Sequence, residues 1–197
     1  MPTSEFQLNF LRRTQWLLES SSYTSTYKFA LLMAITNLSI ESAINDNSEC
    51  SMSYEELAEQ FFQLYWTQTL PFSHQDDDSV LKQSNVGKQA KVVTNILKLQ
   101  QETKNTSIRI ARTRDIKKWQ STIKEVAQTI KNNPAKYLQS AQDKVSREFL
   151  YVYNPKANAI VLMPGIAYCF TRFSRIIHKL CQQYWTEFVR KNRHNQP

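Results

Sequence analysis

Residues 29–38 read FALLMAITNL, and this stretch decides the fold of the chain. Phe29, Leu32 and Ile35 recur at helical spacing, and the apolar residues between them widen the stripe. A helix that is apolar over most of its circumference is surrounded by protein rather than laid on a surface. We therefore expect residues 25–44 to form the central helix of the hydrophobic core.

Helical periodicity predicts further helices on both sides of this segment. Ser53 is followed three residues later by Glu56, which is the pattern of a capping box, and Ser4 is a candidate cap for the first helix. In each expected helix, apolar residues recur at intervals of three and four. These helices are expected at residues 5–19, 54–68, 88–103, 114–131 and 164–191, with a short additional helix to about residue 142.

The spacing of apolar residues changes after the fifth expected helix. FLYVY (149–153) and AIVLM (159–163) are β-like runs on either side of the turn sequence NPKAN, so they predict a hairpin. Residues 104–112 are ambiguous, because Ile108 and Ile110 alternate with polar residues as they would in a short strand.

Together these elements predict an α+β fold that is predominantly helical. It has about six helices and one C-terminal β-hairpin before a long last helix. The polar residues 45–52 are expected to form a loop. Residues 1–197 are expected to form a single helical domain, and a subdivision near residues 101–115, where the charge changes sign, is the alternative.

The basic residues are concentrated in the second half of the chain. Residues 1–100 carry 7 Lys and Arg against 11 Asp and Glu, a net charge of −4, whereas residues 101–197 carry 18 against 6, a net charge of +12. Such an asymmetry indicates a surface for a polyanion or an electrostatic contact within the chain. A solvated basic surface without a partner is the simpler alternative.

Cysteine and glycine usage limits the class of protein. The three cysteines are odd in number and widely spaced, so they predict no disulfide framework, and Cys169 and Cys181 are expected to be buried thiols. Free thiols indicate a reducing cytoplasm. No basic-then-apolar leader and no apolar run near ~18 residues is visible, so no membrane partner is expected. The two glycines, Gly87 and Gly165, cannot make a Gly-rich nucleotide loop.

No arrangement of side chains predicts catalysis, a metal site or a cofactor. His74, His178 and His194 share no close spacing with cysteine or acid pairs, which argues against zinc. The triplet Asp76–Asp78 could hold Mg²⁺, but an acidic triplet on a polar loop is more often solvated. No nucleophile with a partner base is visible. We therefore expect no catalytic residue, metal ligand or cofactor, and leave open whether the chain is an enzyme.

Two groups of basic residues are candidate phosphate contacts. The first is a dense run that enters the helix expected at residues 114–131, and a solvated helix start is its alternative. The second occupies positions i, i+3 and i+7 of the last helix, which places it on one helix face. The candidate nucleic-acid-binding residues are Arg109, Arg112, Arg114, Lys117 and Lys118, and then Arg172, Arg175 and Lys179.

Short motifs along most of the chain resemble a known family. The motifs are TYKFALL (26–32), LAEQF (57–61), YWTQTLP (65–71), LKQ (81–83), FLY (149–151) and MPG (163–165). They are similar to the amino-terminal region of a bacterial family of HNH endonuclease proteins linked to defence. In that family the metal-binding histidines and paired cysteines of the nuclease lie beyond this region. The resemblance therefore implies a non-catalytic part of a nuclease system, with the HNH nuclease domain not present in this chain.

The sequence leads to two expectations about function. The first is a nucleic-acid-binding or DNA-positioning module of a bacterial nuclease and antiviral defence system in the cytoplasm. Its expected ligand is double-stranded DNA, and a nuclease domain or another protein is its expected partner. The alternative is a protein–protein interaction or oligomerisation module, for example a homo-oligomer, that does not bind nucleic acid.

Overall fold

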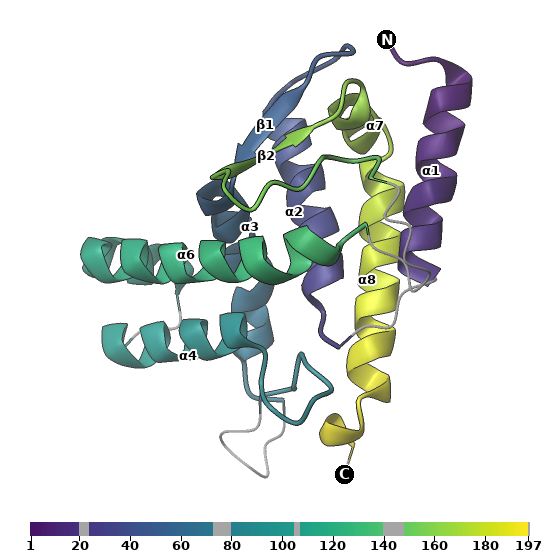
Figure 1. Ribbon diagram of the computed structural model, residues 1–197. Helices are drawn as coiled ribbons and strands as arrows, with labels where there is room; N and C mark the ends of the chain where they lie inside the picture. Colours follow the sequence, from purple (N-terminus) through teal and green to yellow (C-terminus); the bar gives the residue numbers. More distant parts are fainter. Residues whose placement is uncertain (20–23, 73–79, 105–106, 140–147, 197) are drawn as a thin grey trace.

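The computed structural model describes residues 1–19, 24–72, 80–104, 107–139 and 148–196. It confirms the predicted fold class, α+β and predominantly helical, with eight α-helices and one two-stranded sheet in the described part. Two groups of helices cross each other (Figure 1). Side by side lie α1 (Ser4–Glu19), α2 (Tyr27–Glu41) and α8 (Ser174–Lys191), whereas α4 (Lys91–Thr103) and α6 (Ile116–Ile130) run in a crosswise direction on the side away from α1.

Helix α2 is the centre of the structure, as the sequence predicts. Most of its side chains are buried, and Ala30, Leu31 and Ile35 have no exposed surface. It packs on α8, on α3 (Tyr54–Trp66) and on α7 (Ile166–Arg172). Fully burying one leucine or isoleucine side chain stabilises a protein by about 1.5–3 kcal/mol. The enclosure of α2 is therefore a main source of stability.

Helix α1 covers α7 and α8, and its N-terminal cap differs from the prediction. Phe10 faces inward and meets Phe170 of α7 edge to face, with 5.0 Å between the ring centroids. The N–H of Phe6 donates to the hydroxyl of Thr3 over 3.2 Å. Thr3, and not Ser4, therefore supplies the capping oxygen.

Helix α3 connects α2 to the crossing helices. Its capping box is confirmed, since the hydroxyl of Ser53 accepts the N–H of Glu56 over 3.1 Å and the Glu56 carboxylate accepts the N–H of Ser53 over 2.8 Å. Helix α3 packs on both α4 and α6. Trp119 of α6 lies edge to face with Phe62 of α3, with 4.8 Å between centroids. A 3₁₀ turn at Thr67–Thr69 follows α3.

The sheet joins strands that are distant in the sequence, so the predicted hairpin is wrong. Strand β2 (Ala159–Leu162) pairs antiparallel with β1 (Cys50–Ser53), with Cys50 opposite Leu162. Strand β1 lies at the end of a segment that the sequence predicts to be a loop. In the first predicted strand, Tyr151 alone forms a bridge, and its partner is Leu162.

Residues 149–151 contact β2 only through the Tyr151 bridge and the bond from the N–H of Met163 to the carbonyl of Leu150 over 2.8 Å, and the side chain of Gln139 binds their other backbone groups. Its Oε1 accepts the N–H groups of Phe149 over 2.7 Å and of Leu150 over 2.6 Å. Its Nε2 donates to the carbonyl of Tyr151 over 2.8 Å. A buried amide thus satisfies the backbone groups that a neighbouring strand would otherwise pair.

Three helical segments also differ from the predictions. The expected last helix is interrupted at Phe173 (φ −105°, ψ 16°), which separates α7 from α8, and the ring of Phe173 stacks near Phe10 at 6.5 Å. Residues Ile108–Arg114 form a helix, α5, so the strand alternative is wrong. Lys131–Ala135 continues α6 as one π-helical turn, whose wider geometry accommodates Pro134. The short helix expected to about residue 142 extends outside the described residues.

A line of buried and half-buried polar side chains joins α8, α2 and α3 and ends at the exposed Glu41. Nε2 of His178 lies 2.9 Å from Oδ1 of Asn37, whose Nδ2 donates to Oε1 of Gln60 over 2.8 Å. Nε2 of Gln60 donates to the Glu41 carboxylate over 3.0 Å. Because an ionised carboxylate can only accept, it fixes the direction of every bond, and Nε2 of His178 carries the hydrogen. Burial lowers the pKa of His178 below its ordinary value.

Replacing Gln139 with leucine is expected to lower the free energy of unfolding by roughly 3 kcal/mol, because buried N–H and carbonyl groups lose their partners. Gln120→Leu is the matched control, since Gln120 is exposed on α6. The control should change stability by no more than ~0.5 kcal/mol. Urea denaturation followed by circular dichroism measures both variants, and equal stabilities would contradict the role of Gln139.

Lowering the pH from about 7.5 to about 5 is expected to destabilise the wild type more than the variant His178→Gln. The unfolded chain takes up a proton at the ordinary histidine pKa, whereas burial lowers the pKa of folded His178. The neutral His178 side chain therefore contributes its full stability at pH values above the histidine pKa of the unfolded chain. This contribution is lost as the pH falls toward the pKa of folded His178. Glutamine keeps a donor for Asn37 and does not titrate. Denaturation at a series of pH values tests this, and parallel stability curves would exclude it.

Candidate nucleic-acid interface

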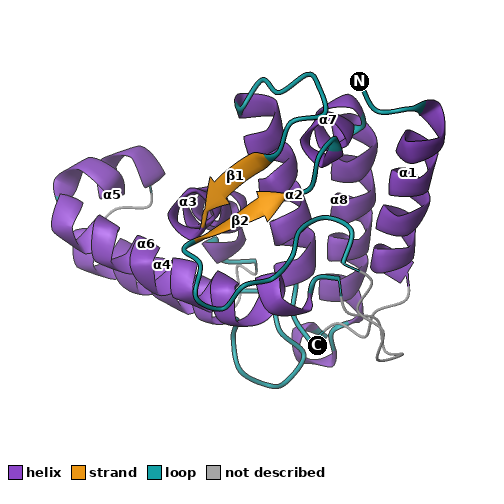
Figure 2. Cartoon of the chain, turned by 45° about the horizontal axis from the view of Figure 1, so that its top comes forward, coloured by secondary structure: helices purple, strands orange, loops and turns teal. Residues whose placement is uncertain are grey.

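The first group of predicted phosphate contacts lies where α5 meets α6. The two helices join at Asp115, whose extended backbone (φ −139°, ψ 86°) turns the chain. The Asp115 carboxylate accepts the N–H of Lys118 over 2.9 Å and so caps α6. We call residues 108–118 the α5–α6 elbow. It lies at the edge of the molecule, away from α1 and α8 (Figure 2).

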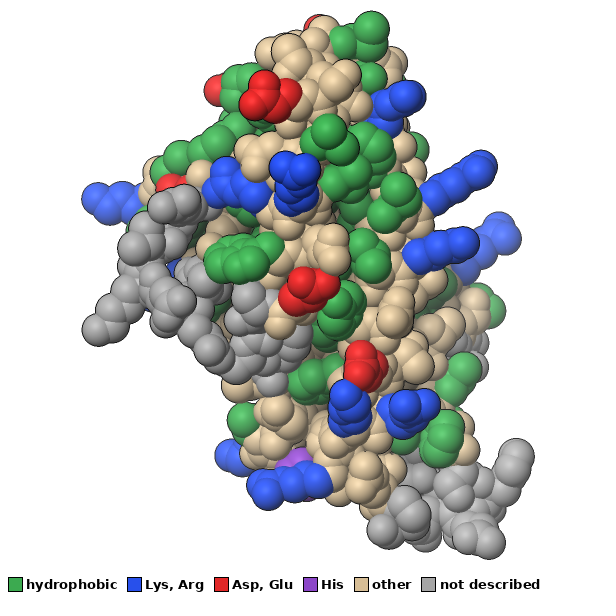
Figure 3. All heavy atoms as spheres, turned by 90° about the vertical axis from the view of Figure 1, so that its right-hand side faces the viewer, with side chains coloured by type: hydrophobic (Ala, Val, Ile, Leu, Met, Phe, Trp, Pro, Cys, Tyr) green, Lys and Arg blue, Asp and Glu red, His purple; other side chains and the backbone are tan. Residues whose placement is uncertain are grey.

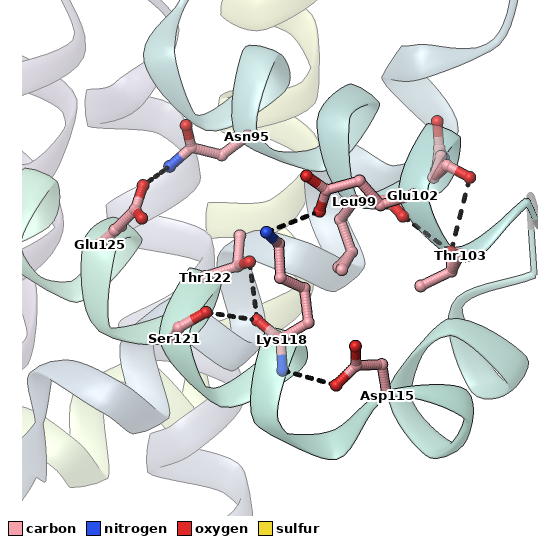
Figure 4. Close-up of polar contacts among 10 residues, drawn as sticks. Asn95, Leu99, Glu102, Thr103, Asp115, Lys118, Ser121, Thr122 and Glu125 are labelled. Atoms are coloured by element: carbon pink, nitrogen blue, oxygen red, sulfur yellow. Dashed lines mark hydrogen bonds and ion pairs between the residues drawn. The ribbon is translucent and has the colours of Figure 1, made fainter.

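Two of the five predicted cations on the elbow are paired with acidic residues of the chain. Nζ of Lys118 lies 2.9 Å from Oε2 of Glu102 on α4, and this hydrogen bond raises the pKa of Lys118 (Figure 4). The guanidinium of Arg112 lies 3.7 Å from Oε1 of Glu59 on α3, and 5.9 Å from the centre of the Trp119 ring. These two side chains therefore position the elbow on α4 and α3.

The other three predicted cations of the elbow are available to a ligand. Arg109, Arg114 and Lys117 are exposed. None of them makes an ion pair within 4 Å with another residue of the described ranges. The N-terminal N–H groups of α6 contribute less, because the Asp115 carboxylate already occupies that end. The elbow thus offers three unpaired positive charges to phosphate.

The second predicted group does not extend this surface. Arg172 ends α7, while Arg175 and Lys179 lie on α8, beyond the interruption at Phe173. The expected single helical face is therefore broken, although all three cations are exposed. In Figures 1 and 2, α7 and α8 lie toward the side that α1 covers, away from α5 and the start of α6. On the face that contains α1, Lys and Arg side chains form separate small groups between hydrophobic and uncharged ones (Figure 3).

The sequence did not predict the acidic partners of the elbow cations or the exposed isoleucines beside them. Glu102 and Glu59 gave no local signal, because they come from other helices and meet the elbow only in the folded chain. Ile116 lies one turn before the buried Trp119 on α6, but 60% of it is exposed. Ile110 on α5 is 45% exposed. The elbow therefore combines unpaired cations with apolar side chains.

Other chemistry has little support in the described residues. They contain no group of three His, Cys, Asp or Glu that could hold a metal ion, and His74 and Asp76–Asp78 lie outside them. Cys169 and Cys181 are buried, as predicted, and burial raises the pKa of both thiols, that of Cys169 to about 11. A thiol with a raised pKa is a poor nucleophile. No helix of the described part is long and apolar enough to cross a membrane.

Comparison with known proteins gives one match. A family model described as "Domain of unknown function (DUF8808)" matches residues 9–197. Neither the curated proteins nor the solved structures gave a match. The residues of the elbow lie inside the matched range.

Replacing Asp115 with alanine is expected to lower the free energy of unfolding by about 1 kcal/mol, because the first turn of α6 loses its cap. Asp115→Asn should retain most of the stability, since an amide oxygen also accepts the Lys118 N–H. Asp46→Ala, in an exposed loop turn, is the control for the loss of one carboxylate. Thermal denaturation compares the three variants. Equal losses for Asp115→Ala and Asp115→Asn would show that the cap is not the cause.

Proposed function

The chain belongs to the family described as Domain of unknown function (DUF8808), and within it we propose that this protein binds nucleic acid, as double-stranded DNA, through the α5–α6 elbow. One observation carries this proposal. Arg109, Arg114 and Lys117 are exposed on a projecting corner without acidic partners among the described residues. A phosphate backbone supplies the negative charges that such a corner lacks.

The electrostatics of the whole chain support the same ligand. Residues 101–197 carry a net charge of +12, and the elbow lies within that half. A positive field of this kind attracts a polyanion over long distances and increases the rate of association. Each phosphate contact contributes about −0.9 to the slope of log affinity against log salt on duplex DNA. Three contacts therefore predict a slope contribution of about −2.7.

We further propose that the protein positions DNA for a nuclease in a bacterial defence system rather than cutting it. This part of the proposal rests on the similarity of residues 26–32 and 65–71 to the amino-terminal region of HNH endonuclease proteins. The family match carries no link to those endonucleases, so the proposal depends on the resemblance. We also propose a cytoplasmic location, because the free thiols indicate a reducing compartment.

A second candidate function is a protein-interaction or oligomerisation surface at the same elbow. The observation that favours it is that Arg112 and Lys118 already bind the carboxylates of Glu59 and Glu102. An acidic partner protein could extend that pattern to the three unpaired cations. The two candidates differ in their duplex binding: the first predicts binding that is measurable near physiological salt, with a slope set by the number of phosphates contacted, and the second predicts that duplex binding vanishes there.

The triple variant Arg109→Gln, Arg114→Gln, Lys117→Gln is expected to reduce the salt slope of duplex binding by about 2.7 and to weaken binding several-fold. Fluorescence anisotropy with a labelled duplex, at salt concentrations between about 50 and 200 mM, measures both quantities. The matched control is Arg172→Gln, Arg175→Gln, Lys179→Gln, which removes the same charge from α7 and α8, outside the elbow. This control should retain most of the slope.

The outcomes separate the two candidates. Equal losses in both triple variants would show general charge attraction and would reject the elbow as the site. Binding that disappears near physiological salt in the wild type would reject the nucleic-acid proposal. A concentration-dependent oligomer that the elbow variant abolishes, measured by light scattering, would then favour the protein-interaction surface.

A further inference from the structure

The apolar stripe of α6 continues past the edge of the core. Trp119 and Ile123 of this stripe are buried, at 4% and 5% exposure, whereas Ile116 at its start is 60% exposed. Ile110, on the other side of Asp115, is 45% exposed. The fold itself does not require two exposed isoleucines at this corner. A ligand that covers them would gain about 25 cal/mol per Å² of apolar surface buried.

The isoleucines belong to the same short segment of the chain as the unpaired cations of the elbow. Ile110 follows Arg109 on α5, and Ile116 precedes Lys117 on α6. A ligand that contacts both kinds of side chain must therefore present negative charge and an apolar surface close together. A phosphate backbone alone would pair with the cations and leave the isoleucines in water. The grooves of a duplex provide both, since phosphates line their edges and sugars and stacked bases lie between them.

The elbow has no exposed aromatic ring on which the bases of a single strand could stack. Trp119 is buried, with its ring under the guanidinium of Arg112 and against Phe62. The other side chains of the elbow are aliphatic, charged or hydroxyl-bearing. Proteins that bind single-stranded nucleic acid stack bases on exposed aromatic rings, and aliphatic side chains do not replace them. A duplex is therefore the better fit.

We infer that the elbow enters the minor groove of duplex DNA and bends it, with Ile110 and Ile116 as apolar wedges. Branched apolar side chains inserted between base pairs unstack them, and basic side chains beside them hold the phosphates of the widened groove. Arg109, Arg114 and Lys117 provide those basic groups, while Arg112 and Lys118 fix the corner on α3 and α4. The bend expected for such a wedge is roughly 20–90°. This inference rests on the proposed function, because it takes DNA binding at the elbow as given.

The test is the end-to-end distance of a duplex of about 30 base pairs labelled at its two ends with a donor and an acceptor dye. Energy transfer should rise when wild-type protein binds. The double variant Ile110→Ser, Ile116→Ser should bind more weakly and leave the duplex straight, while its salt slope stays that of the wild type. Ile176→Ser is the control, because Ile176 lies on α8, outside the elbow, and is 48% exposed, comparably to Ile110. Netropsin, a minor-groove ligand, should compete with the wild type.

Each alternative outcome has a distinct meaning. A bound but unbent duplex, or bending by the double isoleucine variant equal to that of the wild type, would overturn the wedge and leave DNA binding at the elbow intact. Equal bending of an RNA duplex of the same sequence, whose minor groove is wide and shallow, would also overturn it. Failure of the wild type to bind any duplex near physiological salt would reject the proposed function, and the wedge with it.

Discussion

The enclosure of α2 is the constraint on which the rest of the structure depends. A helix that is apolar over most of its circumference must be covered on every side, since each exposed leucine or isoleucine would forfeit about 1.5–3 kcal/mol. Helices α8, α7 and α3 provide that cover. Helix α3 then needs partners for its own outer face, where Phe62 and Trp66 pack against Trp119 of α6. The position of α6, and with it the elbow, follows from the burial of α2.

Buried glutamine side chains hold together segments that are distant in the sequence. Gln139 binds the backbone of residues 149–151, and Gln60 of α3 bonds to Asn37 and Glu41 of α2. Gln83 accepts from the indole of Trp185 on α8 over 2.8 Å. Uncharged amides can be buried at lower cost than carboxylates, because both their donor and their acceptor can be satisfied by neutral partners. The structure thus connects its loops to its core without buried ion pairs among the described residues.

The charge asymmetry of the sequence has two consequences in the folded chain. Some of the basic residues form ion pairs within the molecule. Arg112 pairs with Glu59 of the acidic half, and Lys118 pairs with Glu102, which lies just past the boundary between the halves. Those contacts are exposed and individually weak, on the order of 0–1 kcal/mol each. Their role is therefore to orient the elbow more than to stabilise the fold. The remaining positive charge of the elbow points to solvent.

The sequence by itself determined the helical class, the central place of residues 29–38 and the capping box at Ser53, because these depend on periodicity and on hydrogen bonds between near neighbours. It also located the elbow cations, which lie close together along the chain. Only the tertiary structure decided that β2 pairs with β1, because the two strands are more than a hundred residues apart and meet through the packing of the helices between them. It likewise decided which cations are paired and that Ile116 is exposed, since both depend on where other helices end. Local pattern specifies which faces are apolar, and the packing of distant segments specifies which of those faces are covered.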